Sequence, residues 1–102
     1  MKSEISDAVW VSQTLRLVQA LLGTISENFR MVAISHDGNV WRLLFVLAEE
    51  RADDREEIVD VGHEFEALQD VPIPYEIDVT VTDRPIAWPD SYVRVVYRRR
   101  EI

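Results

Sequence analysis

The chain has no cysteine, and its 102 residues include only three glycines and four prolines. Without cysteine the fold holds neither a disulfide nor a thiolate metal site, so we expect burial to stabilise it in a reducing, cytoplasmic location. Three scattered glycines exclude a glycine-rich phosphate-binding loop. The longest apolar run, residues 43–48, is far shorter than the ~20 residues of a membrane-spanning helix. We therefore expect neither a nucleotide cofactor nor a membrane partner.

The negative charge of the chain is confined to one stretch. The net charge is −8, and residues 49–70 hold ten acids and two arginines, while the nine acids and nine bases elsewhere cancel. An acidic chain is a poor ligand for nucleic acid, because phosphate binding depends on lysine and arginine. A hydrophobic fraction of 47% with 29% charged residues is typical of a folded domain, so residues 1–102 are expected to form a single domain.

Residues 7–22 are predicted to form an amphipathic helix. Ser6 can cap its first turn, and Gly23 can supply the left-handed residue after its last turn. Its predicted packing face recurs at intervals of three and four residues and consists of Val11, Thr14, Leu15, Val18 and Leu22, widened by Trp10 and Leu21.

Four strands are predicted at residues 29–35, 40–47, 75–82 and 92–98. The pair Asp37-Gly38 between the first two predicts a tight hairpin. If the last two strands pair, their charged side chains can meet across the exposed face: Glu76 and Asp78 opposite Arg94 and Arg98. The order α-β-β-α-β-β predicts an α+β fold, with a four-stranded, mainly antiparallel sheet and both helices packed on one face.

The acidic stretch is predicted to form the second helix, capped by Asp53 or Asp54 and buried through Ile58, Val61, Phe65 and Leu68. A second stripe lies about 100° away on the helical wheel and consists of Asp53, Glu57, Asp60 and Glu64, with Glu56 beside it. These carboxylates can dock into the basic cleft of a partner, because complementary charge speeds association. Alternatively, they form a solvated face that keeps the protein soluble.

The loop at residues 83–90 is a second candidate contact surface. Trp88 lies just before Pro89 and close to Pro85, and a tryptophan on a rigid loop is typical of an interface anchor. The alternative is that Ile86 and Trp88 fold back over the end of the sheet. The three terminal arginines, residues 98–100, are expected to pair with acids of the same molecule or its neighbour.

Catalytic and metal-binding patterns are lacking. His36 and His63 have no ligand spacing typical of a metal site, and no serine has a nucleophile-elbow context. Acids on one solvated helix do not face each other across a cleft, as two-carboxylate hydrolysis requires. We therefore expect no enzyme activity, no catalytic residue, no cofactor and no metal.

Three segments carry a resemblance to a known class of proteins: WRLLFVL at 41–47, DREEIVD at 54–60 and VRVVYRRRE at 93–101. In a short, acidic, cysteine-free α+β chain, they resemble the bacterial immunity proteins of polymorphic or contact-dependent toxin systems. The resemblance implies a non-enzymatic cytoplasmic protein that inhibits a cognate toxin by binding it. It supplies no binding residues, so those rest on charge and exposure alone.

The leading hypothesis is an inhibitor that covers a basic site of a toxin, such as a nuclease. Its predicted partner-binding residues are Asp53, Glu56, Glu57, Asp60, Glu64 and Trp88. The alternative is a structural or regulatory subunit of a larger assembly, or a homodimer joined through a strand edge or the Trp88 loop. A small enzyme or ligand-binding domain is the third hypothesis.

Overall fold

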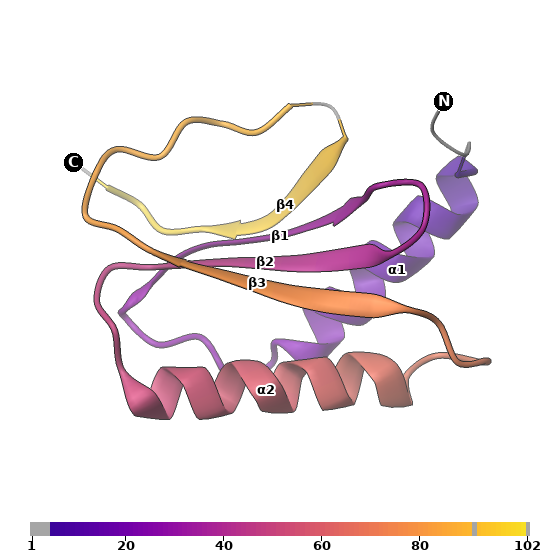
Figure 1. The fold of residues 1–102 in the computed structure, drawn as a ribbon, viewed down its shortest axis with the longest axis horizontal. Coiled ribbons are helices and arrows are strands. Elements are labelled where there is room, and N and C mark those ends of the chain that lie inside the picture. The colour runs from indigo at the N-terminus through magenta and orange to yellow at the C-terminus, as the bar shows by residue number, and fades with distance from the viewer. Residues whose placement is uncertain (1–4, 91, 102) are drawn as a thin grey trace.

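A computed structural model describes residues 5–90 and 92–101. Its elements are α1 (Asp7–Ala20), β1 (Phe29–His36), β2 (Trp41–Leu47), α2 (Ala52–Ala67), β3 (Tyr75–Val81) and β4 (Val93–Arg98). The strands form one sheet in the order β3-β2-β1-β4 (Figure 1). β1 is antiparallel to both β2 and β4, whereas β2 and β3 are parallel. The predicted α+β class and element order are confirmed, and the sheet is mixed.

The parallel pairing of β2 and β3 results from the helix between them. A crossover of a dozen or more residues through a helix returns the chain to its starting end, so the next strand runs in the same direction. Trp41 accordingly pairs with Tyr75 at the start of both strands. The pairing of the last two strands, considered as one possibility from the sequence, does not occur, because β3 and β4 are opposite edges of the sheet. The acids assigned to that pairing contact Arg42 instead, Glu76 at 2.7 Å and Asp78 at 3.6 Å.

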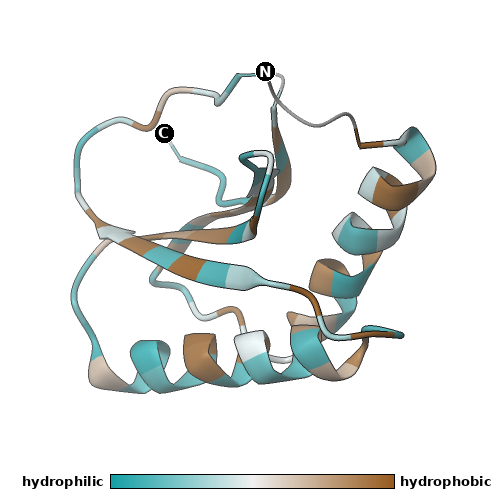
Figure 2. Ribbon diagram, turned by 45° about the vertical axis from the view of Figure 1, so that its right-hand side comes forward, coloured by the Kyte–Doolittle hydropathy of each residue, from teal (hydrophilic) through white to brown (hydrophobic). Residues whose placement is uncertain are grey.

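Two apolar clusters cover the sheet. In the larger one, buried side chains of α1 and α2 join alternate residues of β1 and β2, including Val32, Ile34, Leu43 and Phe45. The smaller cluster uses intervening strand residues, Met31, Ala33 and Val46, with Ile86 packed against them. Figure 2 shows apolar positions alternating with polar ones along β3 and recurring along both helices.

The buried face of α1 differs from the predicted one. Its buried side chains are Trp10, Gln13, Leu17 and Ala20. Val11, Leu15, Val18 and Leu22, which were predicted to pack, are instead between 40% and 75% exposed. The Trp10 ring packs edge-on against Trp41 at 5.1 Å, and the Gln13 amide exchanges two 2.9 Å hydrogen bonds with Gln69. These tertiary contacts set the rotation of the helix, which helical periodicity alone does not determine.

The start of α2 is held by a buried carboxylate. Asp54 is 3% exposed and accepts hydrogen bonds from Ser26 Oγ at 2.9 Å and Asn28 Nδ2 at 2.8 Å. Asn28 also bonds both backbone groups of Glu49 just before the helix. The predicted capping role of Asp53 or Asp54 is wrong, because the cap position is Arg51 and has no side-chain cap bond. Asp54 instead joins α2 to the residues preceding β1.

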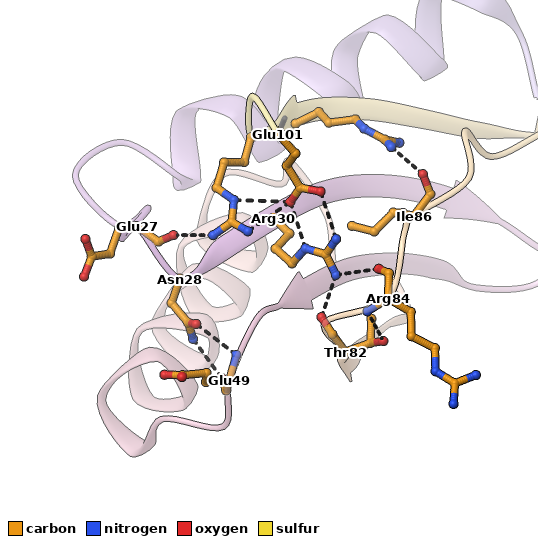
Figure 3. Close-up of polar contacts among 10 residues, drawn as sticks. Glu27, Asn28, Arg30, Glu49, Thr82, Arg84, Ile86 and Glu101 are labelled. Atoms are coloured by element: carbon orange, nitrogen blue, oxygen red, sulfur yellow. Dashed lines mark hydrogen bonds and ion pairs between the residues drawn. The ribbon is translucent and has the colours of Figure 1, made fainter.

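A buried arginine at the start of β1 joins the segments that follow the two edge strands (Figure 3). Arg30 is 4% exposed, and its guanidinium donates to both carboxylate oxygens of Glu101 at 2.8 Å. It also donates to the carbonyls of Thr82 and Arg84. We call this group the Arg30 clasp. Its hydrogen bonds hold the pKa of Glu101 at about 2, and they connect β1, the end of the chain and the loop after β3.

The Asp54 contacts yield a first prediction. Asp54→Ala removes the acceptor of the Ser26 hydroxyl and of one of the two hydrogen bonds that Asn28 Nδ2 donates, so it should lower the free energy of unfolding by about 2 kcal/mol. Asp53→Ala removes an exposed acid from the same helical turn and should change that free energy by less than about 0.5 kcal/mol. Urea denaturation of both variants measures the difference. Equal effects would show that Asp54 does not anchor α2.

The Arg30 clasp yields a prediction of pH dependence. Because the folded pKa of Glu101 lies below the unfolded value of about 4.3, its ionisation stabilises the fold above that value, and the stabilisation is lost as pH falls towards 2. Glu101→Gln should therefore lower the urea midpoint of unfolding most at neutral pH. The gap between the urea midpoints of the variant and the wild type should narrow as the pH is lowered. Glu57→Gln, on an exposed helix face, is the matched control and should produce no such gap. A gap that stays constant down to pH 3 would contradict the assignment.

Candidate partner-binding site

An exposed set of carboxylates follows one side of α2. We call this set the acidic row; it comprises Asp53, Glu56, Glu57, Asp60 and Glu64, all exposed. Four of the five recur at intervals of four, three and four residues, which places them on a common helical face. At a rise of 1.5 Å per residue the row is about 16 Å long. The adjacent side, about 100° around the helix, is buried through Asp54, Ile58, Val61 and Phe65.

Nearby arginines leave the acidic row uncompensated. Arg51 pairs with Glu49 at 3.2 Å and with Glu27 at 3.9 Å. Arg55 pairs with Glu50 at 2.6 Å, and this hydrogen bond lowers the pKa of Glu50. Both arginines of the acidic stretch are therefore engaged outside the row. Among residues 5–90 and 92–101, no ion pair involves a carboxylate of the row.

Two of the three terminal arginines, Arg98 and Arg99, also have partners outside the acidic row. Arg99 pairs with Glu101 at 3.0 Å and donates to the carbonyl of Glu27. Arg98 donates to the carbonyl of Ile86. The expected pairing of the terminal arginines with acids of the same molecule is confirmed for Arg99, and its partner lies outside the acidic row.

Trp88 forms a separate exposed feature. Its side chain is 69% exposed, and the Arg98 guanidinium lies 4.4 Å from the centre of its ring. Ile86 from the same loop packs against the smaller apolar cluster. The loop lies at the side of the molecule away from α2 (Figure 1). The structure therefore brings the five predicted acids together on one helix but does not bring Trp88 to them.

The histidines lie apart from each other. The His36 ring packs 4.6 Å from Trp41 in the hairpin, and His63 is exposed on α2. In the part of the chain that the structure describes, no three acidic, histidine or cysteine side chains form a group able to hold a metal ion. Within the same residues, no helix is long and apolar enough to cross a membrane.

A second candidate surface was missed by sequence reasoning. The apolar residues Val11, Leu15, Val18 and Leu22, which we call the α1 stripe, face solvent instead of the sheet. One signal could have revealed it: Trp10, Leu17 and Leu21 form another apolar side of the same helix. A helix with two apolar sides can bury only one against its own sheet.

Comparison with known proteins gives one match. The MafI2 immunity protein family matches residues 11–101. This range includes the sheet, α2 with its acidic row, and the whole α1 stripe. No curated protein matches the chain. The resemblance to immunity proteins noted from the sequence is thereby confirmed.

Proposed function

This chain belongs to the MafI2 immunity protein family, and we propose that it inhibits a cognate protein toxin by binding it through the acidic row of α2. The observation that carries the proposal is the set of five exposed carboxylates whose neighbouring arginines already pair with other acids. Inhibition is by coverage of the toxin, without catalysis by this chain. A cysteine-free sequence suits action in the reducing cytoplasm.

The charge of the row defines the chemistry of the partner. Five carboxylates along about 16 Å of helix attract a surface that carries several lysines or arginines. A site that binds nucleic acid has this character, because it must neutralise phosphates. A nuclease is therefore the class of toxin that the row fits best. Complementary charge speeds the encounter of the two proteins and aligns the helix over the basic site.

The anchoring of α2 favours tight binding. Asp54 and the buried residues Ile58, Val61 and Phe65 hold the helix in place before any partner arrives. A surface that is already ordered loses less conformational entropy on association than a mobile one. The row therefore acts as a preformed template for the positive charges of the toxin.

Charge reversal tests this assignment. The triple variant Glu57→Lys, Asp60→Lys, Glu64→Lys should slow association with the cognate toxin at least about tenfold at low salt, because it replaces attraction with repulsion. The matched control Asp78→Lys, Asp83→Lys, Asp90→Lys makes the same change in net charge on β3 and the following loop. Its association rate should fall much less than that of the row variant. Surface plasmon resonance at several salt concentrations measures both rates. Added salt should lower the association rate of the wild type and reduce the difference between its rate and that of the row variant.

Two results would contradict the proposal. Equal slowing by both triple variants would show that only net charge matters, without a role for the row. Unchanged association of the row variant, combined with loss of binding by Trp88→Ala, would move the interface to the loop at residues 83–90. Circular dichroism of each variant checks that its fold is retained.

A further inference from the structure

The α1 stripe is an apolar surface without a partner in the fold. Leu15 is 61% exposed, and Leu22, in the turn just after α1, is 75% exposed. Val18 lies between these two residues along the chain, and Val11 lies one helical turn before Leu15. A shallow groove of about 330 Å³ continues the stripe, lined by Val18, Leu22, Ile25, Val96 and Tyr97. Contiguous exposed apolar patches of this kind mark association sites on otherwise soluble domains.

The spacing of the stripe is self-complementary. Its residues follow one another at intervals of four, three and four, which is the repeat that lets two helices interdigitate their side chains. Two copies related by a two-fold axis would present the same stripe to each other, so each apolar side chain meets an apolar neighbour. A second copy of this chain therefore fits the stripe without any further element.

Charge also favours a second copy at this surface. The positions beside the middle of the stripe are Ser12, Thr14 and Gln19, which carry no charge, and Asp7 lies at its end, one turn before Val11. The chain has a net charge of −8, so two copies repel each other wherever their acids meet. The excess acids lie in residues 49–70, on and around α2, and none of the residues of the stripe or its flanks belongs to that segment. A basic partner, in contrast, gains no attraction from an uncharged surface.

We propose that the chain forms a two-fold homodimer through the α1 stripe. A standard stable interface covers about 800 Å² of each partner, whereas the stripe consists of four residues from a 14-residue helix and the turn after it. The groove beside Ile25 and Val96 is therefore covered as well. This interface differs from the strand edge and the Trp88 loop considered from the sequence, and it uses none of the carboxylates of the acidic row.

Sedimentation equilibrium of the purified chain alone tests the dimer. The weight-average mass should rise from 11.9 kDa towards twice that value as concentration increases. Leu15→Glu with Val18→Glu should keep the mass at that of the monomer over the same range, because each copy would bury two charges in the dimer interface. Val59→Glu with Val71→Glu is the matched control at exposed sites outside the stripe, and it should dimerise like the wild type.

The proposal would be overturned by a wild type that remains monomeric up to about 1 mM, the range of the weakest specific complexes. It would also be overturned by a dimer that survives the Leu15→Glu, Val18→Glu change or that the control abolishes equally. Toxin binding does not enter this readout, so a failure here is distinct from a failure of the acidic row.

Cysteine cross-linking provides a second test that introduces no charge. The chain has no cysteine, so Leu15→Cys, near the centre of the stripe, would be the single thiol in each copy. Mild oxidation should produce a covalent dimer at concentrations where Val59→Cys, on α2, remains monomeric. Equal cross-linking of both variants would contradict a dimer centred on the stripe.

Discussion

The inward orientation of Asp54 determines which side of α2 faces solvent. Its carboxylate reaches Ser26 and Asn28 ahead of β1, so the first turn of the helix is fixed relative to the sheet. Ile58 and Phe65 then enter the larger apolar cluster, and the remaining carboxylates of the helix point outward. Because a helix turns 100° per residue, one buried acid in the first turn fixes the direction of the whole acidic row.

Polar contacts at this end of the sheet connect distant parts of the chain. Asn28 holds the segment that leads into α2, and Arg30, two residues later, holds Glu101 and the loop after β3. Figure 3 shows both groups side by side around the start of β1. Breaking a buried ion pair costs more than the pair itself contributes, because it leaves a charge unpaired. The Arg30 clasp therefore makes the positions of both edge strands interdependent.

Local signals in the sequence predicted much of the fold. The Asp37-Gly38 hairpin, the alternation along β3 and the buried stripe of α2 depend on neighbouring residues, and the structure has all three. The acidic row was likewise visible as a helical repeat of carboxylates. The structure shows these side chains exposed and unpaired within its described residues, while their role in binding remains a proposal.

Features that depend on tertiary contacts could not be read from the sequence. The rotation of α1 is set by Trp41 and Gln69, which lie far along the chain. The position of β3 depends on the close approach of α2 at Gly62. A side chain there would collide with β3, because a Cβ at Gly62 would lie 2.7 Å from Ile77 Cδ1. No periodicity within α1 or β3 encodes these neighbours. The exposed α1 stripe was missed for the same reason, since either apolar side of the helix could have faced the sheet.

Carboxylate footprinting of the toxin complex tests the central claim most directly. Carbodiimide-driven amidation followed by mass spectrometry reports the accessibility of each acid in the free and the bound protein. We expect Glu57, Asp60 and Glu64 to lose most of their reactivity when the toxin is bound, while Glu76 and Asp78, on β3, keep theirs. If the acids of the row stay as reactive in the complex as in the free protein, the toxin does not bind there.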